Sequence, residues 1–125
     1  MHTIELITGL SNSGKTTYSQ QYENVYHLDD GFTVDQLELG QDIVIEGVFI
    51  SKKQRKEILD KVKDADYRKI CVWIDTPLIT CLQRNAQRRE FPDSVIFYQA
   101  QRFVAPTEDE GWDEIIRITD YNPEN

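Results

Sequence analysis

Eight residues near the amino terminus have the types and the spacing that hold phosphate groups. Gly9 and Gly14 enclose four residues and are followed by Lys15 and Thr16, which matches the pattern G-x-x-x-x-G-K-[ST] at every position. In this pattern backbone N–H groups and the lysine bind phosphates, and the hydroxyl binds Mg²⁺. The segment predicts a site for a nucleoside triphosphate with Mg²⁺. GTPases, ATPases, kinases and inert binders share it, so it does not name a reaction.

Acidic residues follow two of the apolar runs that predict strands. Asp29 and Asp30 come after residues 25–28, and Glu46 comes after residues 43–45. In an open parallel sheet, the carboxyl ends of the strands face the ligand crevice. Asp29 or Asp30 is a candidate general base for phosphoryl transfer to a hydroxyl, and Glu46 is a candidate holder of the Mg²⁺ water shell. For each of them the alternative is a solvated turn.

Asp75 also ends an apolar run and competes with Glu46 for the metal role. Because Thr76 and Pro77 follow it, we expect Asp75 instead to be a partner of a helix N-terminus.

Three arginines lie on the helix that we expect after Pro77. Arg84 and Arg88 are four residues apart and share a face, and Arg89 follows directly. A lid helix of this kind can place guanidinium groups on the transferred phosphoryl group, although a solvated basic surface is the alternative. The predicted nucleotide-binding residues are Gly9, Ser11, Asn12, Ser13, Gly14, Lys15, Thr16, Thr17 and Arg84.

The segments that position these residues alternate between two patterns. Short β-branched runs predict strands at residues 3–8, 25–28, 42–45, 69–74 and 114–118. Helical patterns start near residue 15 and cover residues 51–65, 77–89 and 94–103. In the second helix, an N-cap Ser51 precedes Ile58, Leu59 and Val62 at helical spacing, above a basic surface. The alternation predicts an α/β fold: a P-loop NTPase-type three-layer sandwich, with about five parallel strands covered on both faces and a helical lid.

Length and composition fit one domain, residues 1–125, and a net charge of −8 disfavours loose binding to nucleic acid. Bases nevertheless gather at residues 52–56 and 84–89, so a local basic face stays open. Cys71 and Cys81 are expected to be buried reduced thiols, and no structural metal is indicated. Without a long apolar stretch or a signal segment, we expect no membrane contact, a frayed tail at residues 121–125 and a cytoplasmic, intracellular protein.

The order of these features resembles the kinase domain of the 5′-hydroxyl polynucleotide kinases of phages and animals, within the wider P-loop kinases. Beyond the phosphate loop, the likeness lies in three segments that span most of the chain. They are Tyr26-His27-Leu28-Asp29-Asp30; Asp75-Thr76-Pro77 with Arg84-Asn85 and Arg88; and Phe103, Pro106-Thr107, Glu110-Gly111-Trp112 and Ile115-Ile116.

The resemblance implies ATP-dependent phosphorylation of a nucleic-acid hydroxyl. Lys15 is then the phosphate lysine, Thr16 the Mg²⁺ ligand, Asp29 the general base and Arg88 the lid arginine, with Arg84 in support. Because the phosphatase domain of many members is absent, only phosphorylation is expected.

The chain departs from that family in two places. Ser11-Asn12 replaces the usual Pro-Gly, and Phe32 stands where phage members have an arginine that holds nucleic acid. Three alternatives stay open. Phe32 and the compact size favour a phage kinase of a hydroxymethylated base, 5-hydroxymethyluracil, within DNA. The acidic net charge favours a small-metabolite or nucleoside kinase, and a nonenzymatic nucleotide-binding module is the third alternative.

Overall fold

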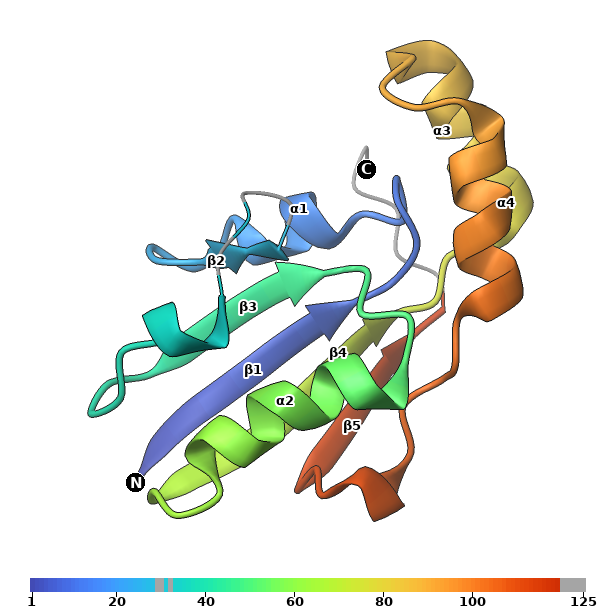
Figure 1. The fold of residues 1–125 in the computed structure, drawn as a ribbon. Coiled ribbons are helices and arrows are strands. Elements are labelled where there is room, and N and C mark those ends of the chain that lie inside the picture. Colours follow the sequence, from blue (N-terminus) through green and yellow to red (C-terminus); the bar gives the residue numbers. More distant parts are fainter. Residues whose placement is uncertain (29–30, 32, 120–125) are drawn as a thin grey trace.

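The computed structural model describes residues 1–28, 31 and 33–119 of the chain. Five strands form one sheet: β1 (His2–Thr8), β2 (Tyr26–His27), β3 (Ile43–Gly47), β4 (Tyr67–Ile74) and β5 (Glu114–Ile118). The helices are α1 (Lys15–Ser19), α2 (Lys52–Val62), α3 (Leu78–Arg88) and α4 (Asp93–Arg102), with short 3-10 turns η2 (Val34–Gln36) and η3 (Glu108–Glu110). All five predicted strands and all four predicted helices are therefore present (Figure 1).

Strand β1 is the middle of a fully parallel sheet in the order β2-β3-β1-β4-β5. Its Ile4, Leu6 and Ile7 are completely buried, as expected for a strand that is covered on both faces and paired on both edges. The register places Thr8 beside Gly47 of β3 and Trp73 of β4. The segment that follows β1 therefore leaves the sheet between the carboxyl ends of two neighbouring strands.

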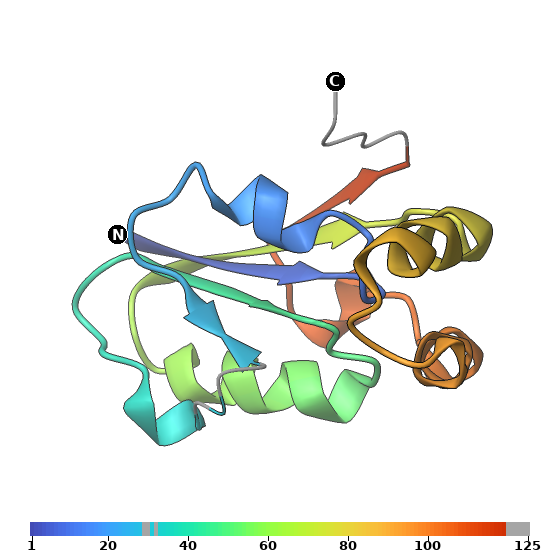
Figure 2. The ribbon, with the colours of Figure 1, turned by 90° about the horizontal axis from the view of Figure 1, so that it is seen from above.

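The helices make this a three-layer structure with an outlying pair. Figure 2 shows α1 on one side of the sheet and α2 on the other, with α3 and α4 beyond the carboxyl ends of the strands. These two helices pack against each other and form the predicted helical lid. Within the residues that the structure describes, no helix has the length and apolar character needed to cross a membrane. Residues 121–125, predicted to fray, lie outside the described range.

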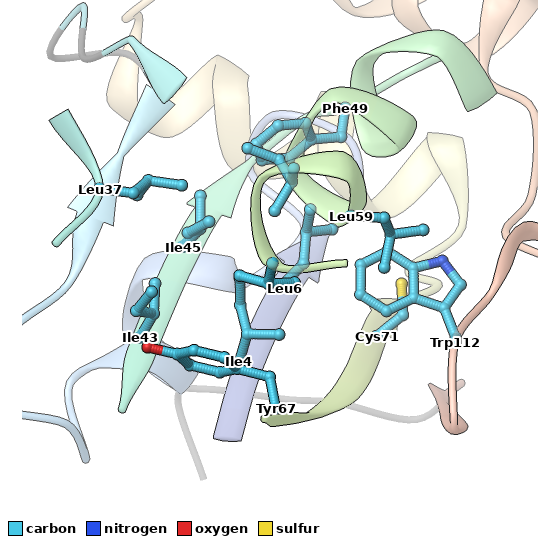
Figure 3. Close-up of a cluster of buried hydrophobic side chains, with 12 residues drawn as sticks. Ile4, Leu6, Leu37, Ile43, Ile45, Phe49, Leu59, Tyr67, Cys71 and Trp112 are labelled. Atoms are coloured by element: carbon cyan, nitrogen blue, oxygen red, sulfur yellow. The ribbon is translucent and has the colours of Figure 1, made fainter. Parts of the chain in front are cut away.

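The larger core lies between the sheet and α2. Ile4 and Leu6 of β1, Ile43 and Ile45 of β3 and Leu59 of α2 belong to one cluster of buried side chains (Figure 3). Helix α2 begins as predicted, because the Ser51 side chain accepts a hydrogen bond from the N–H of Gln54 at 3.2 Å. Both cysteines, Cys71 on β4 and Cys81 on α3, are buried free thiols, which confirms that prediction.

One member of the predicted basic surface of α2 is not on the surface. Arg55 is fully buried, and its Nε and Nη2 atoms donate to the Glu110 carboxylate at 2.8 and 3.1 Å. Its Nη1 atom donates to the carbonyl of Phe49 at 2.9 Å. Positions 55, 58, 59 and 62 share one helical face, so Arg55 belongs with the apolar residues, and the expectation of a surface base was wrong. The pair instead holds the segment before β5 against α2.

Asp75 does not cap helix α3. The N-cap residue is Pro77 and makes no side-chain capping bond. The Asp75 carboxylate accepts hydrogen bonds from Nε and Nη2 of Arg117 at 2.9 and 2.6 Å. The prediction was wrong because β5 pairs with β4 in a register that brings Arg117 to the end of β4, and an arginine is a stronger partner than helix N–H groups.

Candidate nucleotide site

The phosphate loop starts in a confined place between β1 and β4. A Cβ atom at Gly9 would lie 2.6 Å from the carbonyl oxygen of Ile74 and 2.7 Å from Oγ of Ser13. Both contacts are closer than real Cβ atoms approach, so only glycine fits there. The hydroxyl of Thr76, just after β4, donates to the Ser13 carbonyl at 2.7 Å and ties the loop to the neighbouring strand end.

Asn12 takes over a backbone role that glycine usually fills. Its φ angle is 65°, in the left-handed region that L-residues avoid, and asparagine is among the few side chains that adopt it readily. Its side chain is also held from the lid, because Nδ2 donates to Oδ1 of Asn85 at 3.4 Å and Oδ1 accepts from Arg88 at 3.3 Å. The departure from Pro-Gly at residues 11–12 therefore keeps the turn and adds contacts.

The helix after the loop begins at Lys15, as predicted, but has only five residues. Its aligned peptide dipoles are correspondingly few, so a phosphate bound here would interact with the loop N–H groups and the lysine more than with a long helix dipole. Lys15 is 7% exposed and its Nζ atom donates to the carbonyl of Leu10 at 2.8 Å. The ammonium group is thus held over the loop.

Thr16 and Glu46, the two predicted metal residues, meet at the carboxyl end of β3. Oγ1 of Thr16 donates to the Glu46 carboxylate, at 3.2 Å from Oε1 and 3.4 Å from Oε2. Adjacent oxygens around Mg²⁺ are about 2.9 Å apart when the metal–oxygen bonds are 2.0–2.1 Å. These hard oxygen donors, at this separation, suit Mg²⁺ or a water of its shell.

Glu46 has a second partner that the sequence did not reveal. Nδ1 of His27, the last residue of β2, lies 2.5 Å from Oε2 of Glu46. The two residues are direct neighbours in the β2–β3 pairing. The only sequence signal was that His27 ends a predicted strand, and the contact depends on a strand order that the sequence does not state.

A cavity of about 180 Å³ lies over the loop. Six predicted nucleotide-binding residues line it: Ser11, Asn12, Gly14, Lys15, Thr16 and Thr17. Glu46 and Arg88 line it too, together with Glu90 and Phe91, which sequence reasoning missed. Ser13 lies behind the loop, where its Oγ atom is buried without a hydrogen-bond partner among the residues described. The candidate lysine, metal residues and lid arginine thus share one hollow.

Residues of α3 and α4 form hydrogen bonds with the phosphate loop. Nη1 of Arg84 donates to the carbonyls of Asn12 and Ser13 at 3.1 and 3.2 Å, so this arginine supports the loop backbone, and its contact with phosphate stays a prediction. Gln99 of α4 makes a two-point contact: its Oε1 accepts from the N–H of Ser11 at 2.9 Å and its Nε2 donates to the Ser11 hydroxyl at 2.8 Å. Residues of the predicted helices thus position the phosphate loop.

The residues predicted to contact the acceptor fall partly outside the described range. Asp29, the predicted general base, its alternative Asp30, and Phe32 all lie outside the described residues. The residues on either side, Leu28 and Thr33, line a second cavity of about 270 Å³ with Val34 of η2, Phe49, and Gln54, Glu57 and Ile58 of α2.

Comparison with known proteins assigns the fold. A family model described as an AAA domain matches residues 21–106, which begin just after α1 and include both lid helices. No curated protein sequence matches the chain.

Solved structures share nearly the whole fold at low identity. Kti12 of Chaetomium thermophilum, solved with ADP-AlF3, aligns at a TM-score of 0.72 and 14% identity over 94% of this chain and 89% of its own. A gluconokinase of Sinorhizobium meliloti 1021 aligns at 0.68 and 11% over 98% and 85%. The APS kinase CysC of Mycobacterium tuberculosis, solved with AMPPNP and APS, aligns at 0.65 and 17% over 98% and 91%. These likenesses show that the chain shares its fold with Kti12, the gluconokinase and the APS kinase.

Proposed function

The chain belongs to this AAA domain family, and from that premise we infer that it is an ATP- and Mg²⁺-dependent kinase whose acceptor is a hydroxyl group of nucleic acid. The observation that carries the kinase part is the convergence of Lys15, Thr16, Glu46 and Arg88 on one cavity over the phosphate loop. A protein that only binds nucleotide needs the loop, but it does not need a lid arginine facing the same hollow. Two of the structural neighbours described above are themselves named as kinases.

Each residue of the donor half has a task that follows from its position. Lys15 would exchange the Leu10 carbonyl for the β- and γ-phosphate oxygens. Arg88 would leave Oδ1 of Asn12, a neutral acceptor at 3.3 Å, for the more strongly attracting phosphoryl oxygens. Thr16 and Glu46 would hold Mg²⁺, which when bound neutralises charge on the triphosphate.

Asp29 is the proposed general base. In the sequence it comes two residues after His27, the last residue of β2, which pairs with Glu46 of β3. A carboxylate that follows this strand can orient the acceptor hydroxyl and take its proton during in-line transfer.

The second cavity favours an acceptor with a flat apolar body. Leu28, Val34, Phe49 and Ile58 supply apolar walls, and polar groups come from Thr33, Gln54 and Glu57. This combination suits the ring of a nucleobase, which offers two apolar faces and a hydrogen-bonding edge. It supports a nucleic-acid acceptor, and equally one whose hydroxyl is on a modified base such as 5-hydroxymethyluracil.

A small-metabolite or nucleoside kinase is the second candidate. The net charge of −8 favours it, because a small substrate needs no basic track. Acidic Glu57 in the cavity walls disfavours an anionic metabolite, so a neutral nucleoside is the better fit within this class.

An acceptor panel tests the proposal. The purified protein is incubated with γ-labelled ATP and Mg²⁺ and, in separate reactions, 5′-hydroxyl DNA and RNA oligonucleotides, end-blocked DNA containing 5-hydroxymethyluracil, free nucleosides and gluconate. We expect label in one of the polymers. Asp29→Asn should abolish transfer and keep ATP affinity, whereas the matched control Asp35→Asn, an exposed acid of η2, should keep both.

Label only in nucleosides or gluconate would overturn the nucleic-acid acceptor and support the second candidate. Absence of transfer to every acceptor, with ATP binding intact, would leave a nonenzymatic nucleotide-binding module. Full turnover in Asp29→Asn would contradict the assigned base and favour Asp30.

A further inference from the structure

The contact between His27 and Glu46 is built into the sheet. Strand β2 has only two residues, and its parallel pairing with β3 sets His27 directly beside Glu46. Neighbours in register point to the same face, so the imidazole and the carboxylate meet without any loop rearrangement. Nδ1 and Oε2 are 2.5 Å apart. A carboxylate oxygen accepts hydrogen bonds, so the contact is made by the imidazole tautomer that has N–H at Nδ1.

The same carboxylate also meets the phosphate loop. The Glu46 side chain is 6% exposed, and its oxygens lie 3.2 and 3.4 Å from Oγ1 of Thr16. A carboxylate so buried can rotate about its last torsion unless each oxygen has a partner. His27 holds Oε2 from the side of β2, and Thr16 meets the group from the side of the loop.

We propose that His27 is a positioning residue for the Mg²⁺ site of the nucleotide, acting through Glu46. The proposal rests on the proposed function only in taking Mg–ATP as the ligand. The donated Nδ1–H fixes the rotation of the carboxylate, so that Glu46 meets the metal or its water shell beside Thr16. Outer partners of this kind commonly change metal affinity by about 10–100-fold when they are removed.

The geometry of the contact suggests a pair of matched variants. In His27→Asn the amide nitrogen is as many bonds from Cα as Nδ1 is, so the hydrogen bond to Glu46 can be kept. In His27→Gln the nitrogen is one bond farther, where Nε2 lies, and that bond is lost. The His27 side chain is 34% exposed, so neither change opens a buried cavity. His2→Gln is the control, because His2 lies near Asp42 at 3.5 Å with its side chain half exposed.

Calorimetric titration with ATP over a series of Mg²⁺ concentrations, with a parallel series in EDTA, reads the effect without any acceptor. We expect His27→Gln to raise the Mg²⁺ concentration for half-maximal gain in ATP affinity about tenfold or more. His27→Asn and His2→Gln should stay close to the wild type, and all four proteins should bind ATP equally in EDTA. A purely structural role for His27 would weaken binding in EDTA as well.

The proposal is overturned if His27→Gln and His2→Gln show the same Mg²⁺ dependence, or if the wild-type affinity for ATP does not respond to Mg²⁺. Failure of the acceptor panel, with these titrations as expected, would count against the kinase and leave the role of His27 intact.

Discussion

Asn12 adopts a left-handed backbone conformation that usually requires glycine, and its side chain also contacts the lid helix. A left-handed backbone costs most L-residues about 1–2 kcal/mol, and asparagine less, because its short polar side chain bonds locally. Here the side chain contacts Asn85 and Arg88 of the lid helix. Turn geometry and lid attachment thus depend on the same residue.

Two substitutions of Asn12 separate the cost of the left-handed backbone from the effect of the lid contacts. Asn12→Gly keeps the backbone conformation and loses the lid contacts, whereas Asn12→Ala loses the contacts and adds strain. We expect the alanine variant to have a free energy of unfolding about 1 kcal/mol below that of the glycine variant, measured by urea denaturation.

Gln20 supplies the control for this pair. It is exposed and right-handed, with φ of −61°, so there the order should reverse and alanine should be the more stable. Equal stability of the two Asn12 variants would show that the left-handed conformation carries no cost.

The sequence predicted the place of some site residues and not that of others. Lys15, Thr16 and Glu46 stand at positions that the loop pattern and the strand pattern specify, and the structure brings them together. His27 and Gln99 act through pairing and docking between distant segments. Their partners are determined by the strand register and by the position of α4, which no local pattern contains.

At the scale of elements, the buried pair Arg55–Glu110 joins α2 to the turn η3. Burial acts to raise the pKa of Glu110. Hydrogen bonds from Arg55, from the backbone of Thr107 and from Trp112, together with the charge of Arg55, outweigh it and hold the pKa below its usual value. The folded state therefore favours the ionised carboxylate.

Removal of one partner should be costly. Arg55→Met leaves Glu110 without its counter-charge, and we expect a loss of about 3–5 kcal/mol in the free energy of unfolding at neutral pH. The double variant Arg55→Met/Glu110→Met should recover most of this loss. A double variant no more stable than the single one would show that the pair is needed for packing and not for charge compensation.

Acid should weaken the same pair. Because the folded pKa of Glu110 is lowered, its contribution is fully present above the ordinary value of 4.5 and is lost as pH falls through the folded pKa. Urea denaturation from pH 7 down into this range should show a steeper loss of stability in the wild type than in the double variant. Parallel profiles would contradict the lowered pKa.

Helical spacing could have placed Arg55 correctly, since it falls in the i, i+3, i+4, i+7 series with Ile58, Leu59 and Val62. The expectation was wrong because a charged side chain is usually exposed, whereas this one is buried with the Glu110 carboxylate as its partner. The turns η2 and η3 are only three residues long, but each begins with a capping box that the sequence contains, Thr33 with Gln36 and Thr107 with Glu110.

For the whole molecule, the two thiols report on different parts of the fold. Burial raises the pKa of Cys71, on the central part of the sheet, to about 12, and it raises the pKa of Cys81, on α3, as well. Neither should react with Ellman's reagent at pH 8 while its surroundings stay closed, because the thiolate is the reactive form.

We expect Cys81 to be labelled before Cys71, because the lid helices should detach before the sheet unfolds. In Cys71→Ala, the remaining Cys81 should react when the lid helices detach, and ATP should slow it. In Cys81→Ala, the remaining Cys71 should react only at the rate of global unfolding. The labelling rate over a urea series distinguishes the two, and equal rates without denaturant would contradict separate opening of the lid.

The central place of β1 has a consequence for how the chain is made. This strand is synthesised before both of its neighbours in the sheet, β3 and β4, and the residues that hold its loop, Arg84, Asn85 and Gln99, come later still. A ribosome-bound chain that stops before α4 therefore contains the complete phosphate-binding sequence in a form that has not assembled. Nucleotide can stabilise this fold only after α4 has been translated.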